Sequence, residues 1–232
     1  REKGGHFKDL SDFFKRVENN RVNRRVLEGL IQCGAFDFTG IHRARLFASL
    51  DSIIKFYGGA HDPNQLTIFS SLTAGNSGFT GMLELADVGE WDQREKLKRE
   101  KESLGFYITG HPLEEYKREV TLFSTHTIEG ILNMKGKAEV KAAGVIENLK
   151  LKRTKKGDMM AILDLEDQTG SIEVLIFPET YSKYSVYLKS EDPLMITGAA
   201  EVDDSRSKIV AREIESLSTL RTKAVKIVEV PL

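Results

Sequence analysis

Apolar residues near the start of the chain recur at the spacing of helices. In two segments they return every three or four positions, which is the period of a helix with one buried face. Ser11 or Asp12 is expected to cap the first helix and Asn23 the second, because short polar side chains accept hydrogen bonds from the free N–H groups of a helix start. A third helix is expected over residues 44–54. The apolar positions of the first two helices are Leu10, Phe13, Phe14 and Val17, followed by Val26, Leu27, Leu30 and Ile31.

A seven-residue hairpin, residues 34–40, is expected to join the second and third helices. Its first residue is a glycine, which suits the positive φ that commonly ends a helix. Such a turn can aim backbone N–H groups at a phosphate, and the next helix begins with cationic side chains. The alternative is an ordinary connection between helices. The residues predicted to contact a duplex backbone are Gly34, Phe36, Gly40, His42, Arg43 and Arg45.

The middle of the chain changes character twice. Residues 58–81 are rich in Gly, Ser, Thr and Asn, which predicts an exposed loop, but residues 65–69 form a compact apolar island inside it. Residues 92–102 carry a run of alternating charges, which is typical of a solvated helix. A short helix is expected from Pro112 to Val120, because proline suits a first helical turn.

From about residue 135 the pattern changes to the alternation of strands. The order of elements is β-β-β-α-β-β with a long first strand, which is the order of an OB barrel. The fold class is therefore α+β: a mostly helical N-terminal part with a helix-hairpin-helix, then a five-stranded OB barrel. Tyr181, Tyr184 and Tyr187 are expected to pack on the end of the barrel. The strands are expected at residues 138–151, 159–165, 171–177, 194–202 and 208–217, with a helix at 179–188.

The loop between the first two strands carries five cations within seven positions, although the formal net charge of the chain is only −1. OB barrels bind oligonucleotides with this loop, with the face of strands 2 and 3, and with the loop between strands 4 and 5. Strands 2 and 3 offer a single aromatic side chain for stacking, so the grip on a single strand should be weak. The alternative is a hairpin tip kept soluble by lysines. The predicted single-stranded DNA contacts are Lys150, Lys152, Arg153, Lys155, Lys156, Phe177, Arg206 and Lys208.

Other classes of function find no support in the sequence. The five histidines lack ligand spacing, and no Ser, His and acid set has a catalytic context. The single cysteine, Cys33, excludes an internal disulfide. No apolar run approaches the roughly 20 residues of a membrane span. We therefore expect a non-catalytic binding module with no cofactor, metal or small-molecule substrate and no contact with a membrane.

Several motifs together resemble the C-terminal part of the alpha subunit of bacterial DNA polymerase III, the replicative polymerase. The fairly specific ones are residues 34–37 (Gly-Ala-Phe-Asp) and residues 109–113 (Thr-Gly-His-Pro-Leu). Residues 23–28, 42–44, 105–107 and 154–157 also fit, as do barrel residues such as Phe177. The resemblance covers essentially the whole chain, and the chain is expected to be a piece of a longer one.

The resemblance implies a division of the chain into five parts. In that family the catalytic carboxylates lie upstream, so the parent would be a DNA-directed DNA polymerase, a nucleotidyltransferase, while this chain alone is expected to be inactive. The parts are the end of a helix-hairpin-helix DNA-binding domain (residues 1–57), a flexible loop with a clamp-binding motif (58–81), a helical connector (82–134), the OB domain (135–220) and the start of a truncated C-terminal domain that binds the clamp-loader tau subunit (221–232).

The resemblance also assigns partners. Residues 65–69 look like the motif that docks on the sliding clamp, the beta subunit: Gln65 would hydrogen-bond in the pocket, and Leu66, Ile68 and Phe69, on either side of Thr67, would fill its apolar part. Tau binding is expected only with the complete C-terminal domain, since residues 224–232 resemble a first strand that is cut short.

The expected function is to position duplex and single-stranded DNA and to tether the polymerase to the clamp, in a bacterial, cytoplasmic replisome at the nucleoid. The alternative is an RNA-binding OB module such as the anticodon-binding region of a tRNA synthetase. The clamp-like pentapeptide and the helical hairpin have no role in that alternative.

Overall fold

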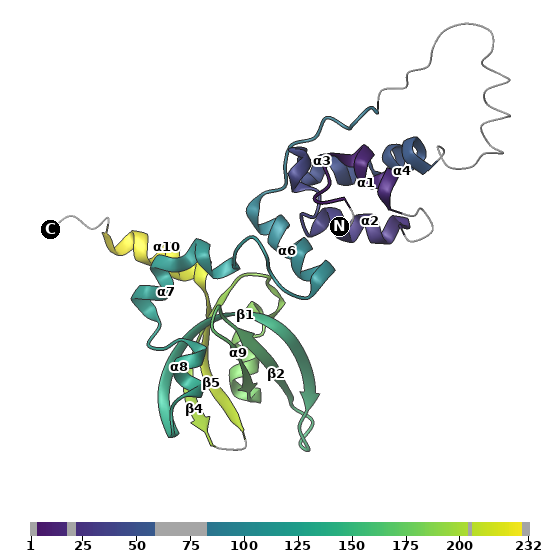
Figure 1. Ribbon diagram of the computed structural model, residues 1–232. Coiled ribbons are helices and arrows are strands. Elements are labelled where there is room, and N and C mark those ends of the chain that lie inside the picture. The colour runs from purple at the N-terminus through teal and green to yellow at the C-terminus, as the bar shows by residue number, and fades with distance from the viewer. Residues whose placement is uncertain (1–3, 18–21, 59–82, 204–205, 229–232) are drawn as a thin grey trace, which may run out of the picture. The chain divides into compact units, whose positions relative to one another are not determined.

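The computed structural model describes residues 4–17, 22–58, 83–203 and 206–228. By its contacts the chain divides into two compact units, residues 1–110 and residues 111–232, shown as a ribbon in Figure 1. The residues expected to form one helical connector, 82–134, are shared between the two units. Among the described residues, no helix is both long and apolar enough to cross a membrane.

The first unit consists of helices and turns around one core. Leu27, Ile31, Leu46 and Leu50 are at most 2% exposed, as the predicted apolar faces require, whereas Val26 of the predicted set is 40% exposed. Phe13 adds an aromatic side chain that packs edge-on against other rings. The helices are α1 (Leu10–Arg16), α2 (Arg24–Gln32), α3 (Arg43–Ala48), α4 (Leu50–Gly58) and α6 (Gln93–Leu104).

The helix starts in this unit agree with the sequence in part. Asn23 caps α2 as predicted, since its side chain accepts a hydrogen bond from the N–H of Val26 at 3.0 Å. The prediction of Ser11 or Asp12 as the first cap was wrong: α1 begins earlier, and Asp9 accepts from the N–H of Asp12 at 2.7 Å. The expected third helix is two helices, α3 and α4, which are separated at Ser49.

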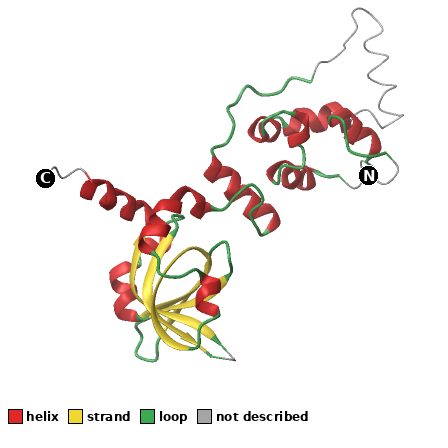
Figure 2. Cartoon of the chain, turned by 60° about the vertical axis from the view of Figure 1, so that its left-hand side comes forward, coloured by secondary structure: helices red, strands yellow, loops and turns green. Residues whose placement is uncertain are grey.

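The second unit is built on a closed five-stranded barrel, which confirms the predicted OB architecture. Neighbouring strands follow the order β1-β2-β3-β5-β4, and all pairs are antiparallel except β3 with β5. The same strands appear in yellow in Figure 2. They are β1 (Gly136–Arg153), β2 (Met159–Glu166), β3 (Ser171–Ile176), β4 (Leu194–Val202) and β5 (Ser207–Ser216).

Two glycines allow the barrel to close. The first half of β1 pairs with β4 and the second half with β2, and the change occurs at Gly144. A Cβ atom there would lie 2.8 Å from the carbonyl oxygen of Glu166. At Gly198, beside a register shift between β4 and β5, a Cβ atom would collide with the carbonyl oxygen of Val210. Both positions therefore need a residue without a side chain.

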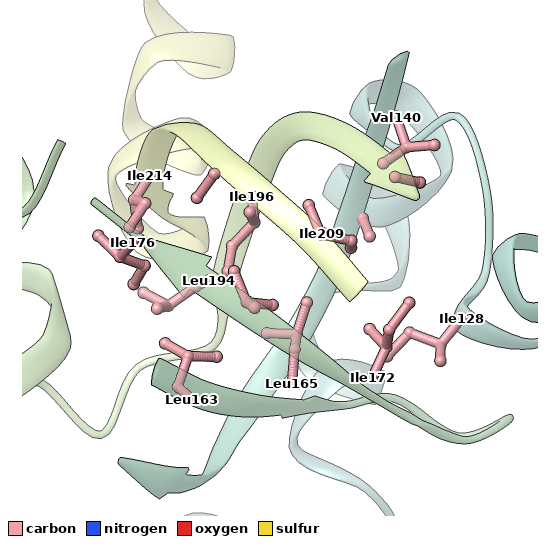
Figure 3. Packing of buried hydrophobic residues seen from close by; sticks show 14 of the residues in the cluster. Ile128, Val140, Leu163, Leu165, Ile172, Ile176, Leu194, Ile196, Ile209 and Ile214 are labelled. Carbon is pink, nitrogen blue, oxygen red and sulfur yellow. The ribbon is translucent and has the colours of Figure 1, made fainter. Parts of the chain in front are cut away.

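Along β2 and β3, every second residue points into the barrel, as the alternation predicts (Figure 3). Leu163, Leu165 and Ile172 are at most 3% exposed. The helix between β3 and β4 is α9 (Pro178–Tyr184), followed by the short turn η5 (Tyr187–Lys189). Its tyrosines pack against the barrel core, which confirms the role predicted for Tyr181, Tyr184 and Tyr187.

Helices also cover part of the outside of the barrel. Leu113, Tyr116, Leu217 and Leu220 form a cluster with Ala143 of β1 and Met195 of β4. This cluster lies over the region where β1 pairs with β4, and it contains no residue of β2 or β3. The helices that supply it are η4 (Pro112–Tyr116), α7 (Lys117–Phe123) and α10 (Leu217–Val228). A further helix, α8 (Ile128–Leu132), packs Ile128 and Ile131 into the barrel core.

Two of these helices differ from the sequence prediction. α8 was not predicted, because its five residues are too few to show a periodic pattern. The expectation that residues 224–232 begin a strand was wrong as far as Val228, because α10 continues to that residue. Leu217 and Leu220, three positions apart, are buried against η4, and this contact favours a helix over a strand.

Candidate nucleic-acid interface

The β1–β2 hairpin extends beyond the neighbouring strand β3. β3 ends at Ile176, which pairs with Ala161, and Ala161 pairs with Leu151 of β1. Residues 152–160 therefore project past the end of β3. Figure 1 shows the hairpin formed by β1 and β2. A tight turn closes the tip, since the N–H of Gly157 donates to the carbonyl oxygen of Thr154 at 2.9 Å.

The cations of this hairpin are exposed and uncompensated. All five predicted residues occupy the end of β1 or the turn, and each is exposed. Within the described residues, none of their side chains forms an ion pair or a hydrogen bond with another residue. Their positive charge is therefore available to an external anion. The five are Lys150, Lys152, Arg153, Lys155 and Lys156.

The hairpin presents these cations on two sides. Lys150 lies opposite Ile162 and Lys152 opposite Met160, so both point to the outer face of the sheet. Arg153 belongs to the other face, because successive residues of a strand alternate. The two tip lysines follow the strand. A backbone that crosses the outer face would therefore meet Lys150 and Lys152.

Next to the two lysines, the outer face carries partly exposed apolar side chains. Ile162 of β2 pairs with Leu175 of β3, which in turn lies beside Val210 of β5. Phe177, the only aromatic residue predicted here, follows β3 and is 46% exposed. These side chains form a strip across β2, β3 and β5, which we call the apolar strip. It offers contact area for bases but little aromatic stacking.

The cations predicted in the loop between β4 and β5 are paired with carboxylates. Nη2 of Arg206 donates to both carboxylate oxygens of Glu173, at 2.7 and 3.0 Å. Nζ of Lys208 lies 3.1 Å from Glu201, which also pairs with Lys137. Both predicted contacts are thus already engaged by carboxylates of the barrel, unlike the cations of the hairpin.

The predicted helix-hairpin-helix turn is present in the first unit. Gly34 and Gly40 have φ of +76° and +69°, which confirms the conformation predicted for Gly34, and the turn η2 (Asp37–Thr39) lies between them. Phe36 is 3% exposed and packs against Phe13, so its side chain belongs to the core. The sequence analysis included Phe36 in the turn predicted to contact a duplex backbone; its buried side chain leaves only its main chain for such a contact, which stays a prediction.

Arg43, in the same predicted contact set, has a buried side chain as well. Its side chain is 5% exposed and its nitrogens are occupied: Nη2 donates to Asp37 at 2.6 Å and Nη1 donates to Glu100 at 2.7 Å and to the carbonyl oxygen of Gln32 at 3.2 Å. A buried guanidinium with these partners is not available to a phosphate. Arg43 instead ties the turn to α6.

Glu100 completes this buried network. It is fully buried, and its second oxygen accepts hydrogen bonds from the N–H groups of Ile108 and Thr109 at 2.8 and 2.9 Å. Burial raises the pKa of Glu100, but the bonds from Arg43 and from these N–H groups outweigh it and hold the pKa below its ordinary value. The charged pair also raises the pKa of Arg43, through the bonds to Asp37 and Glu100.

A carboxylate also lies at the start of α3. Glu90 accepts a hydrogen bond from the N–H of Ala44 at 3.2 Å and lies 3.4 Å from Nδ1 of His42. Burial raises the pKa of Glu90, but the bonds from Ala44, Trp91 and Lys96 keep it below the ordinary value. An internal anion thus uses one of the N–H groups that a phosphate would need. Arg45 donates to the carbonyl oxygen of Ala86 at 3.0 Å.

Of the residues predicted to contact duplex DNA, only some keep an accessible surface. His42 has a side chain that is 62% exposed, and Gly40 is exposed at the end of the turn. The predicted clamp-binding residues Gln65, Leu66, Thr67, Ile68 and Phe69 lie outside the described residues. Among the residues that are described, no group of three His, Cys, Asp or Glu side chains is placed to hold a metal ion.

The acidic partners in both units escaped the sequence analysis. Glu100 was assigned to a solvated helix face, and it lies 57 positions from Arg43 in the chain. Glu173 and Arg206 are 33 positions apart. No local pattern signals pairs at such separations. The one available signal is the repeated Glu in a helix with few apolar positions.

Comparison with protein families and known proteins agrees with both units. Residues 1–46 match a family model described as a helix-hairpin-helix motif, and residues 140–217 match one described as an OB-fold nucleic acid binding domain. Relatives named DNA polymerase III subunit alpha cover nearly the whole chain. The protein from Vibrio cholerae is 32% identical over 96% of this chain, that from Escherichia coli K12 is 33% identical over 96%, and that from Thermus aquaticus is 35% identical over 87%.

The shared segment is a small part of those relatives. The alignment covers 20% of the Vibrio cholerae and Escherichia coli proteins and 16% of the Thermus aquaticus protein, so this chain spans about a fifth of their length or less. The resemblance predicted from the sequence motifs is confirmed. Over nearly its whole length, this chain is similar to the part of bacterial DNA polymerase III subunit alpha that combines a helix-hairpin-helix motif with an OB-fold nucleic-acid-binding domain, as expected of the C-terminal region of that subunit.

Proposed function

We propose that this chain is a DNA-holding module of a bacterial replicative DNA polymerase, and that its barrel holds single-stranded DNA through the β1–β2 hairpin. The observation that carries the proposal is the contrast in partners. Five exposed cations, from Lys150 to Lys156, have no anionic partner within the described residues, whereas Arg206 and Lys208 at the loop between β4 and β5 are paired with carboxylates. Uncompensated cations bind phosphates and release counterions from the nucleic acid.

The outer face of the barrel supports the same role. Lys150 and Lys152 point to the face that carries the apolar strip, so phosphates and bases of one strand can be bound side by side. Because Phe177 is the only aromatic residue there, most of the affinity comes from charge and little from stacking. Binding of this kind is nearly independent of base sequence.

The helical unit has a smaller part in this proposal. Its exposed contribution to a duplex is the turn at Gly40 with His42, since Phe36 and Arg43 are buried. Backbone N–H groups and a histidine hold a phosphate without reading bases. We assign this unit to weak, sequence-independent contact with duplex DNA.

The remaining proposals rest on the resemblance to the alpha subunit. Gln65–Phe69 dock on the sliding clamp, which tethers the module to DNA, and tau is bound only by a chain that includes a complete C-terminal domain. The polymerase reaction belongs to the parent protein, in the bacterial cytoplasm, and this chain has neither polymerase nor nuclease activity by itself. Similarity to polymerase subunits over 96% of the chain favours DNA over the RNA-binding alternative.

The test is a salt titration. Binding of the 232-residue chain to fluorescent oligo-dT is measured by anisotropy from low to moderate salt. The log–log slope should approach about −3, at roughly 0.7 per neutralised phosphate for single strands. Replacing Lys155 and Lys156 by Ala should flatten the slope by up to about 1.4.

The matched control replaces Lys183 and Lys189 by Ala, which removes the same charge from α9 and η5 of the same unit. This control should keep the slope of the wild type. The proposal is wrong if affinity barely responds to salt, or if Phe177→Ala weakens binding far more than the hairpin pair does. Tighter binding to oligo-rU than to oligo-dT would favour the RNA alternative.

The clamp motif is tested separately. Ile68→Ala combined with Phe69→Ala should abolish binding to an immobilised sliding clamp in surface plasmon resonance, because each buried apolar side chain contributes roughly 1.5–3 kcal/mol. The hairpin variant lacking Lys155 and Lys156 serves as the control and should bind the clamp normally. Unchanged clamp affinity in the double variant would contradict the assignment.

A further inference from the structure

The turn between β4 and β5 is fastened to strand β3. The guanidinium of Arg206 binds both oxygens of Glu173, as described above. The turn itself is closed by two hydrogen bonds: the N–H of Arg206 donates to Asp203 Oδ1 at 2.8 Å, and the N–H of Asp203 donates to the carbonyl oxygen of Arg206 at 3.1 Å. Backbone and side chain together hold the arginine against the barrel.

Glu173 lies in an acidic part of the outer face. It pairs directly with Asp164 of β2 in the register, and two like charges opposite each other on a sheet repel. Each carboxylate has a compensating donor: Nδ2 of Asn148 donates to Asp164 at 3.1 Å, and Arg206 donates to Glu173. The combined field of the two carboxylates therefore attracts Arg206 more strongly than one alone would.

This acidic pair is one step along the strands from the apolar strip. Asp164 lies two residues from Ile162 along β2, and Glu173 lies two residues from Leu175 along β3, so all four side chains are on the same face. A phosphate that approached Arg206 would have to displace Glu173 and would meet both negative charges. On the hairpin side no described carboxylate pairs with the lysines.

We propose that Glu173 is a specificity-determining residue that withholds Arg206 from nucleic acid, so that the barrel engages a strand from the hairpin side only. The inference rests on the proposed function and deepens it. Glu173 competes with a phosphodiester for the same guanidinium, since both present two oxygens to its N–H groups. In this way one of the loops that an OB barrel offers to nucleic acid is kept out of the interface.

The solvent exposure of the Arg206–Glu173 ion pair limits how much its loss can change the affinity for DNA. The side chain of Arg206 is 62% exposed and that of Glu173 is 26% exposed. Ion pairs this accessible to solvent change an equilibrium by up to about fivefold. Removing the competitor should therefore change the affinity for DNA several-fold, which an anisotropy titration resolves.

The experiment is a double-mutant cycle on the full chain with oligo-dT. Glu173→Gln should tighten binding about three- to fivefold at low salt and make the log–log salt slope more negative by roughly 0.7, the value for one more phosphate. Arg206→Ala alone should change the dissociation constant less than twofold. In the Glu173→Gln background, Arg206→Ala should remove both the gain in affinity and the extra slope.

The control is Glu213→Gln, which removes the same charge from an exposed position near the other end of β5. Equal gains from Glu173→Gln and Glu213→Gln would mean that only net charge matters, and would overturn the proposal. A loss on Arg206→Ala as large as that from a hairpin lysine would also overturn it, because Arg206 would then already contact DNA. Weaker binding by Glu173→Gln would point to a structural role and would likewise refute the inference.

The two proposals fail in different ways. If the Lys155 and Lys156 variant binds normally, the hairpin is not the binding site and the proposed function fails. If that variant loses affinity while Glu173→Gln has no effect beyond the control, the proposed function stands and only the role of Glu173 fails.

Discussion

The helical turn around Gly34–Gly40 and the hairpin between β1 and β2 both carry cations that the sequence assigns to DNA. In the turn, Arg43 is 5% exposed and bonds to Asp37, Glu100 and a backbone carbonyl. In the hairpin, all five cations are exposed, and none has an anionic partner within the described residues. A cationic side chain thus stabilises the fold in the helical turn, whereas in the hairpin it remains available to a ligand.

This difference shows what decides whether a cationic side chain stabilises the fold or binds a ligand. A charge that is buried must be paired, since removing an ion from water is costly. A charge on a protruding hairpin stays hydrated and gains most when it meets a phosphate. The number of cations in a segment says little by itself. Burial and the presence of an acidic neighbour decide between the two roles, and both depend on tertiary structure.

Replacing Arg43 gives the strongest test of the contrast between the turn and the hairpin. Arg43→Ala leaves Glu100 buried without its cation, which should lower the free energy of unfolding by about 3–5 kcal/mol. Trp91 is the only tryptophan and lies in the first unit, against Phe47, so its fluorescence in a urea titration follows this unit.

Two variants serve as controls for that measurement. Arg45→Ala removes an arginine two positions later that donates a hydrogen bond to the carbonyl oxygen of Ala86, and should cost about 1 kcal/mol. Lys156→Ala in the hairpin should stay within about 0.5 kcal/mol of the wild type. Equal losses from Arg43→Ala and Lys156→Ala would show that the two regions do not differ in this way.

Acidification should lower the stability of the first unit by a smaller amount than Arg43→Ala does. The pKa of Glu100 is lowered in the folded protein, so its contribution to stability is present above the pKa of the unfolded chain and is lost as the pH falls through the lower, folded value. The loss should be smaller than for Arg43→Ala, because a protonated carboxyl group retains hydrogen bonds. The urea midpoint reported by Trp91 should therefore fall on acidification from about pH 6 to pH 3, around the ordinary pKa of about 4.3.

Glu100→Gln isolates this contribution from that of other carboxylates. The variant should be less stable than the wild type near neutral pH and should lose less stability on acidification. A parallel decline of the two proteins would mean that Glu100 does not control the acid response of the first unit.

The smallest expected effect is a difference in DNA affinity between two neighbouring cations of the hairpin. Lys152 and Arg153 are neighbours but point to opposite faces, and only Lys152 shares the face of the apolar strip. Lys152→Ala should weaken oligo-dT binding about three- to fivefold, and Arg153→Ala less than about twofold, if one phosphate contact is lost in the first case alone. Equal losses would mean that the strand wraps the tip of the hairpin and does not follow the outer face.

Much of the fold was predictable because it depends on local patterns. Alternation along β2 and β3 places Leu163 and Leu165 inside the barrel, and Asn23 and Gly34 mark helix ends by their own chemistry. The basic hairpin was predictable for the same reason, since its cations are close together in the sequence. These features need no knowledge of distant residues.

The remainder depends on contacts between distant segments. Arg43 next to a glycine-rich turn suggests a phosphate contact until Glu100 of α6 is placed beside it. The pairing of Arg206 with Glu173 follows from the parallel register of β3 and β5, which no local pattern indicates. The last residues before Val228 form a helix because Leu217 and Leu220 are buried on η4. The family resemblance had indicated the start of a strand at residues 224–232.

The short helix α8 depends on a turn far along the chain. Asp167, in the turn between β2 and β3, accepts hydrogen bonds from the N–H groups of Thr169 and Gly170, and its other oxygen accepts from the N–H of Ile128 in α8, 39 positions away. A helix of five residues is unstable by itself.

This dependence sets an order of events during folding. The β2–β3 hairpin closes from local contacts, whereas α8 gains the acceptor for its first N–H group only after that turn has formed. Substitutions in α8 should therefore speed unfolding and leave the rate of folding nearly unchanged, as low φ-values. The barrel would begin to fold from the β2–β3 hairpin, and α8 would be attached later.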